Sequence, residues 1–173
     1  IPAAAGAQAI TPPSDDGAKV VAQNIRDWIA KQFEGTGVDS TGLPLKVVPD
    51  GENYRLEIGF GGSYFNNMLT MSDGAFAATV KPVDGGKWQI VSGAMASPLR
   101  GEVRDADGAP ASVAEIAIGK QDLTGTFDPS LASPSTFVTT ILGYTVTTRA
   151  ASGVQKSVAE RLSGRSEWQP TAP

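Results

Sequence analysis

The sequence predicts an α+β or mainly β fold, in which one N-terminal helix packs on a twisted antiparallel β-meander. An amphipathic helical stripe lies near the N-terminus, and after Gly42 apolar residues alternate with polar ones. The 20 Gly and 12 Pro recur between the alternating segments. A strand spacing of about ten residues is typical of short strands joined by turns. The 173 residues fit one domain, expected over residues 10–173.

The helix is expected over about residues 15–34. Ser14 is suited to cap it, and Asp15 and Asp16 lie in its first turn, where carboxylates complement the helix dipole. Gly35-Thr36-Gly37 ends it. Its apolar residues recur at helical spacing and form one stripe that packs on a sheet: Val21, Ile25, Trp28, Ile29 and Phe33.

Residues 43–93 alternate with the period of a strand. The clearest strand covers residues 54–60, whose apolar members are separated by Arg55, Glu57 and Gly59. An Asp-Gly pair at 84–85 predicts a hairpin. The other strands of this part are expected at 45–47, 64–71, 76–80 and 88–91.

The second half continues the same pattern. A strand at 100–104 is followed by the turn 105–108, and the Val-, Ile- and Thr-rich segment 137–148 favours a strand, with a short helix after Pro134 as the alternative. A last hairpin around Gly164 would join 157–162 to 165–169. With two further strands at 113–118 and 123–127, the sheet would have roughly seven to ten strands.

The composition excludes several kinds of site. The chain has no Cys and no His, which removes the Ser-His-Asp triad, the thiolate nucleophile, disulfides and the usual ligands of zinc, haem and copper. No cofactor and no metal are therefore predicted. The net charge of −4 argues against binding to nucleic acid, which needs a basic surface.

The N-terminal residues 1–9 predict export. They are small or apolar, and Ala7-Gln8-Ala9 has the form of a signal-peptidase site. We interpret them as a signal-peptide remnant, with an Ala-rich flexible arm as the alternative, and expect a periplasmic or secreted bacterial protein. The sequence contains no run of 18 consecutive apolar residues, so no transmembrane segment is predicted in it. The chain ends at Pro170-Thr171-Ala172-Pro173, which is either a polar tail or a point from which the polypeptide continued.

Several motifs have a plain structural explanation. Asp105-Ala106-Asp107-Gly108 resembles the start of a calcium loop, but Gly108 arrives two residues early, so a turn is expected. The segment 64–69 combines aromatic and amide side chains, as either a ligand-binding lip or an edge segment. A glycosidase would need two carboxylates facing one cleft. The candidate glutamates are instead expected on solvent-facing strand positions: Glu57, Glu102, Glu115, Glu160 and Glu167.

The order of a signal remnant, one amphipathic helix and many short strands resembles bacterial envelope proteins whose curved sheet wraps or bridges lipids. It is also similar to carriers of outer-membrane lipoproteins and to cystatin-like folds with a helix on a sheet. The stretches that carry the likeness are Tyr54–Phe60, Lys87–Ser92 and Leu123–Ser130. The resemblance implies a lipid-handling role and identifies no functional residue.

The leading hypothesis is therefore a non-enzymatic exported protein that binds a lipid or another apolar or amphipathic ligand between helix and sheet. The second hypothesis is an envelope scaffold or protein-interaction domain that uses a strand edge or an apolar patch. The third is a carboxylate-dependent enzyme acting on polysaccharide. The side chains expected to line the ligand site are Trp28, Phe33, Phe60, Phe76 and Trp88.

Overall fold

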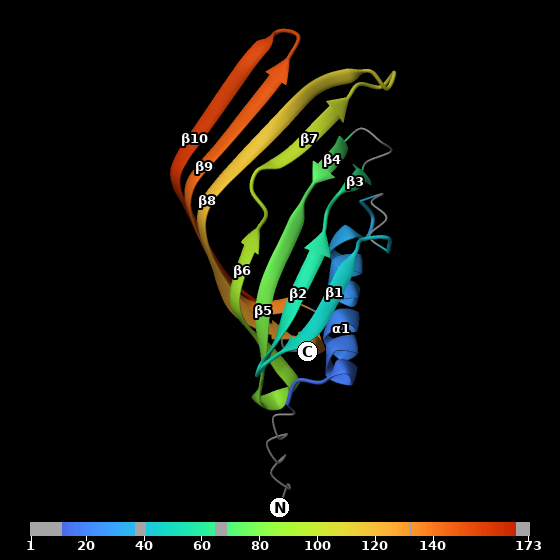
Figure 1. Cartoon of the computed structure of the whole chain (residues 1–173), viewed down its shortest axis with the longest axis vertical. Helices are drawn as coiled ribbons and strands as arrows, with labels where there is room; N and C mark the ends of the chain where they lie inside the picture. Colours follow the sequence, from blue (N-terminus) through green and yellow to red (C-terminus); the bar gives the residue numbers. More distant parts are fainter. Residues whose placement is uncertain (1–11, 37–40, 65–68, 132, 169–173) are drawn as a thin grey trace, which may run out of the picture.

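The computed structural model describes residues 12–36, 41–64, 69–131 and 133–168. The predicted signal remnant at 1–9 lies outside them, as does most of the segment 64–69. The described residues form one helix, two short 3-10 turns and ten strands (Figure 1). In chain order these are α1 (Asp15–Phe33), β1 (Leu45–Asp50), β2 (Asn53–Gly59), β3 (Gly62–Tyr64), β4 (Leu69–Asp73), β5 (Ala75–Val83), η1 (Asp84–Gly86), β6 (Lys87–Met95), β7 (Leu99–Arg104), β8 (Pro110–Asp128), η2 (Pro129–Leu131), β9 (Ser133–Ala150) and β10 (Gly153–Glu167).

All strands pair antiparallel in one open sheet. The order along the sheet is β1-β2-β5-β6-β8-β7-β4-β3, and β9 and β10 extend it from the other edge of β8. The α+β, mainly β class predicted from the sequence is confirmed. The order is not that of a simple meander, because β2 pairs with β5 rather than with β3.

Three short breaks account for this order. β2 and β3 are separated by Phe60 and Gly61, β4 and β5 by Gly74, and β6 and β7 by residues 96–98. Backbone bonds link the breaks: Phe60 N donates to Gly74 O at 2.6 Å, and Ala96 N donates to Ala75 O at 2.6 Å. The breaks therefore line up and set a lower half of the sheet, with β1, β2, β5 and β6, apart from an upper half, with β3, β4 and β7 (Figure 1). The long strands β8 to β10 run through both halves.

The helix begins where the sequence predicts and covers the lower half of the sheet. Gly17 N donates to Ser14 Oγ at 3.0 Å, which is the predicted N-cap. Ser14 N donates to Tyr54 Oη at 3.1 Å and so ties the start of the helix to β2. The apolar stripe of α1 packs against alternate residues of β2 and β5, and the buried core comprises Ala18, Val21, Ile25, Ile29, Leu43, Tyr54, Leu56, Ile58, Ala78, Val80 and Phe127.

Between the segments of β8 that pair with β7 and with β6, side chains make the hydrogen bonds that link β8 to its neighbours. It pairs with β7 through residues 110–116 and with β6 through residues 125–127. In the interval, Gln121 Oε1 accepts from Met95 N at 2.8 Å and Gln121 Nε2 donates to Met95 O at 2.7 Å. Ile118 N donates to Ser97 Oγ at 2.8 Å. These bonds satisfy backbone groups that the diverging strands leave without a ladder partner.

Two predictions about the second half are wrong. The separate strands expected at 113–118 and 123–127 are one strand, β8, which runs through Gly119. A Cβ at Gly119 would lie 2.3 Å from Leu142 O, so this glycine allows β9 to approach closely and does not end the strand. The hairpin around Gly164 is also absent, because β10 is continuous through it; the turn lies at 151–152, next to Gly153 with a φ of 138°.

The single strand expected over 64–71 is also wrong, because its two ends belong to β3 and β4, which pair antiparallel with each other. Other local predictions hold. The hairpin at 84–86 is present, with Gly85 and Gly86 at φ 76° and 69°. The segment 137–148 is part of β9 and not a helix. No helix among the described residues is both long and apolar enough to cross a membrane.

Candidate functional site

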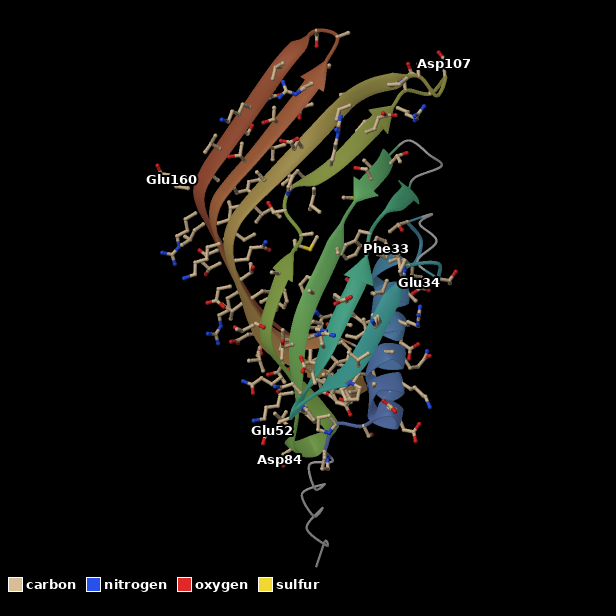
Figure 2. All side chains as sticks on the ribbon, viewed as in Figure 1. Phe33, Glu34, Glu52, Asp84, Asp107 and Glu160 are labelled. Atoms are coloured by element: carbon tan, nitrogen blue, oxygen red, sulfur yellow. The ribbon has the colours of Figure 1, made fainter. Side chains whose placement is uncertain are left out.

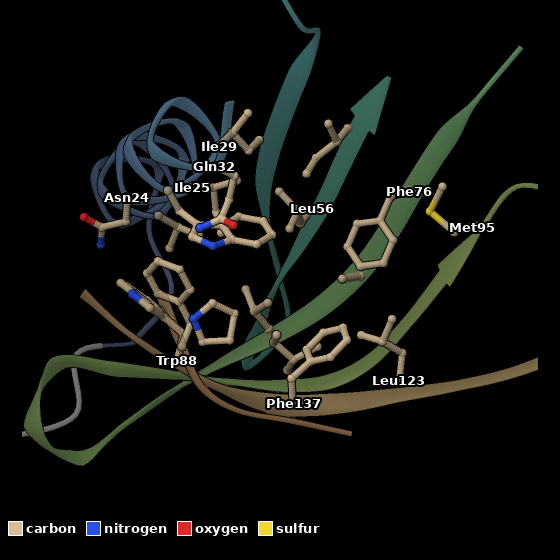
Figure 3. A pocket seen from close by; sticks show the side chains of 18 of the residues that line it. Asn24, Ile25, Ile29, Gln32, Leu56, Phe76, Trp88, Met95, Leu123 and Phe137 are labelled. Atoms are coloured by element: carbon tan, nitrogen blue, oxygen red, sulfur yellow. The ribbon is translucent and has the colours of Figure 1, made fainter. Parts of the chain in front are cut away.

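A cavity of about 360 Å³ lies between α1 and the inner face of the lower sheet (Figure 3). Its walls come from α1, β2, β5, β6, β8 and β9. The helix therefore stands off from part of the sheet and leaves room between the two layers. A volume of this size falls within the range of small-molecule sites.

The roof of the cavity is the apolar stripe of α1. Ile25, Trp28 and Ile29 point from the helix toward the sheet, spaced so that they fall on one side of it. The Trp28 ring meets the Phe127 ring edge to face, with centroids 6.5 Å apart. This contact joins the helix to β8.

The floor and the far wall come from alternating strand residues. On β2 and β5 the buried positions alternate with exposed ones, which directs Leu56, Ile58, Ala78 and Val80 into the cavity. Leu123 of β8 and Phe137 of β9 close the side away from the helix (Figure 3). The site is thus assembled from segments more than a hundred residues apart.

All five residues predicted as ligand-lining surround this one cavity. Trp28 and Phe33 are on α1, Phe60 follows β2, Phe76 is on β5 and Trp88 is on β6. The fold brings these five residues together around the cavity, and ligand binding by them stays a prediction.

Sequence reasoning missed the contribution of β8 and β9 to the walls, and that of Met95 on β6. Met95, Leu123, Phe127, Pro134 and Phe137 all line the cavity. Strand alternation gives Leu123 and Phe127 the same side of β8, which was a usable signal. Nothing in the local sequence shows that β9 folds back far enough to add Phe137.

Polar groups are scarce around the cavity. Asn24 and Gln32 of α1 are the polar side chains among its lining residues, and no charged side chain is among them. The indole Nε1 of Trp88 is buried without a hydrogen-bond partner in the described part of the chain. The ring of Trp88 packs edge to face on Tyr54, with centroids 5.9 Å apart. The surroundings therefore favour an uncharged, hydrocarbon-rich ligand.

One buried charge lies beside the cavity, at the end of β8. Asp128 is 9% exposed and follows Phe127. Ser130 Oγ donates to Asp128 Oδ1 at 2.6 Å, and Lys87 Nζ lies 3.0 Å from Asp128 Oδ2. The hydrogen bond from Ser130 first, and then Lys87, hold the pKa of the Asp128 carboxyl below its ordinary value, although burial opposes this shift. The group is a charge paired within the fold and does not line the cavity.

The predicted carboxylate positions do not gather at the cavity. None of the five candidate glutamates lines it. Glu102 pairs with Arg104, and Arg165 pairs with Glu167 on the same strand. Asp105 Oδ1 accepts from Asp107 N at 3.0 Å and Ala109 N at 2.9 Å, so this segment is the expected turn. The described residues contain no group of acidic side chains suited to hold a metal ion.

Comparison of the chain with protein-family models, with curated proteins and with solved structures found no match.

Proposed function

We propose that this protein binds an apolar or amphipathic ligand, such as a lipid, in the cavity between α1 and the sheet, and that it does so without catalysis. The observation that carries the proposal is an apolar cavity of about 360 Å³ whose lining contains no charged side chain. Burial of hydrocarbon contributes about 0.8 kcal/mol per methylene group, so such a wall favours a hydrocarbon chain.

The size of the cavity suggests the length of the chain it takes. A methylene group is comparable in size to a water molecule, which occupies about 30 Å³ in the liquid. A cavity of about 360 Å³ therefore accepts roughly a dozen such groups. This corresponds to one acyl chain of medium length. Asn24 and Gln32 on the helix side are the lining groups that would meet a polar, uncharged head group.

The proposal includes the periplasmic or secreted location expected from Ala7-Gln8-Ala9. Fractionation of the source cells tests this part separately. Recovery of the protein only with cytoplasmic markers would remove it and leave the ligand proposal standing.

The decisive measurement is native mass spectrometry of the protein purified gently from its host, paired with titration by N-phenyl-1-naphthylamine, a fluorescent probe of apolar sites. We expect adducts of lipid mass and saturable fluorescence enhancement. Absence of both would refute the proposal.

A pair of variants on β5 shows whether the probe enters this cavity. Ala78 is buried and lines it, whereas its neighbour Ala77 is exposed on the opposite face. Ala78→Leu should lower probe affinity at least about tenfold, because the added methylene groups occupy ligand space. Ala77→Leu adds the same atoms outside and should leave the affinity unchanged. Equal effects of the two substitutions would contradict binding at this site.

A further inference from the structure

The outer edge of β10 has no partner strand among the described residues. β9 pairs with one edge of β10 along residues 153–167, and β10 is the last strand on that side of the sheet. Every residue of β10 except Ala159 is exposed, and Figure 2 shows Glu160 pointing away from the molecule. The unpaired backbone groups of such an edge can accept another strand.

Exposed apolar side chains recur along β10 at a strand period. Val154, Val158 and Leu162 are 63%, 65% and 40% exposed. Their spacing of four residues puts them on one face of the strand, and the intervening positions of that face are Lys156 and Glu160. Along this face the order of side chains is therefore apolar, positive, apolar, negative, apolar. The apolar residues lie symmetrically about Val158, and the two charges on either side of Val158 are opposite in sign.

That order complements itself in an antiparallel pair. When two copies of β10 pair about a two-fold axis at Val158, Val158 faces its own counterpart and Val154 faces Leu162. Lys156 of each copy then faces Glu160 of the other, so both charges are matched twice. On the other face Gln155 meets Arg161, with no like charges opposed.

Neighbouring registers lose this match. Pairing centred on Glu160 sets the two copies of Glu160 opposite each other, and pairing centred on Lys156 sets the two copies of Lys156 opposite each other. Both arrangements oppose like charges and are repulsive. Pairing centred on Ala159 sets Val158 against Glu160, and pairing centred on Ser157 sets Lys156 against Val158. Charges on an edge strand ordinarily block association. Here they block the other registers and permit one.

We infer that β10 is the docking edge for a second copy of this chain, paired antiparallel about Val158 so that the two sheets become one continuous sheet. The association is isologous, since each copy offers the same strand. No residue of β10 lines the cavity, so this inference stands or falls apart from ligand binding.

Cysteine cross-linking tests both the association and its register, because the chain has no Cys of its own. Val158→Cys puts two thiols opposite each other, within the Cα separation of about 4.4–6.8 Å that a disulfide needs. Val154→Cys is the matched control, since its two copies would be displaced by eight residues, or about 27 Å. Rapid disulfide-linked dimer from the first variant only is the expected result. No preference for Val158→Cys overturns the inference.

A charge exchange gives an independent test in the unlinked protein. Sedimentation velocity over a wide range of concentration should show a dimer of the unmodified chain. Lys156→Glu and Glu160→Lys, each alone, should raise the dissociation constant about tenfold or more, and the double exchange should restore it, because opposite charges again face each other. Lys46→Glu on the far edge strand β1 should change nothing. A strictly monomeric native chain, or failure of the double exchange to restore association, overturns the inference.

Discussion

The half of the sheet that α1 covers and the outermost strand β10 consist of similar alternating strands, but their apolar side chains differ in burial. In β2, Leu56 is 3% exposed because α1 lies over it, whereas in β10, Val158 is 65% exposed. Both residues occupy apolar positions in a strand of alternating pattern. The difference shows that alternation supplies an apolar face but only a second layer buries it.

The lengths of α1 and β8 explain why the helix covers only part of the sheet. A helix of 19 residues is about 28 Å long. The 19 residues of β8 extend about 60 Å. One helix therefore covers less than half of the longest strands, and the remaining face depends on another chain, a ligand or polar side chains.

The sharpest test of the comparison is a pair of truncations, one on each side. Leu56→Ala removes a fully covered side chain and should lower the free energy of unfolding by about 2–5 kcal/mol. Val154→Ala in β10 should change it by less than about 0.5 kcal/mol in dilute protein. Urea unfolding followed by circular dichroism measures both. Similar costs at the two sites would mean that the exposure of β10 does not persist in solution.

A smaller effect on stability is expected where the start of α1 contacts β2. Gly→Ala within a helix ordinarily stabilises it by about 1 kcal/mol. A Cβ at Gly17 would lie only 1.9 Å from Tyr54 Oη, so Gly17→Ala should instead destabilise the protein by about 1–3 kcal/mol. Thermal unfolding compares it with Gly17→Ala in a Tyr54→Phe background, where removal of the hydroxyl should recover part of the loss. Stabilisation by the single substitution would show that the helix does not seat on β2 in this way.

The smallest effect concerns the charge at the margin of the covered half. Asp128→Asn should cost about 1–2 kcal/mol near neutral pH, because it weakens the bonds with Ser130 and Lys87. The folded pKa of Asp128 is lowered, so its stabilising contribution is present above its ordinary pKa of about 4 and is lost as the pH falls through the folded value.

Urea unfolding at a series of pH values checks this prediction. The stability difference between the native chain and Asp128→Asn should narrow as the pH falls below about 4. Asp122→Asn, on an exposed position of the same strand, is the control for the change of one carboxylate to an amide. A gap that stays constant down to low pH would contradict the assignment of the lowered pKa.

Local chemistry made much of the fold predictable from the sequence. The cap at Ser14, the helical spacing of α1, the alternation of β2 and the Asp-Gly turn at 84–85 each depend on a few neighbouring residues. The five aromatic residues expected at the site were predictable because a helix stripe and sheet face with apolar side chains must meet.

Two of the errors arose at glycines in the second half of the chain. The two strands expected at 113–118 and 123–127 are continuous through Gly119, and the hairpin expected around Gly164 is a continuous strand. At Gly119 the reason is the close approach of Leu142 O on β9, which no local pattern contains. The same limit hid Phe137, which joins the cavity wall only because β9 folds back along β8.

The sequence by itself determined the kinds of element, their caps and turns, the absence of Cys and His chemistry, and the apolar faces available for burial. The tertiary structure decided which of those faces are covered, that a cavity remains between α1 and part of the sheet, and that β10 is the last strand on its side of the sheet among the described residues. The physical reason is range. Hydrogen bonding and side-chain alternation act between near neighbours, whereas burial depends on which distant segments come to lie above a face.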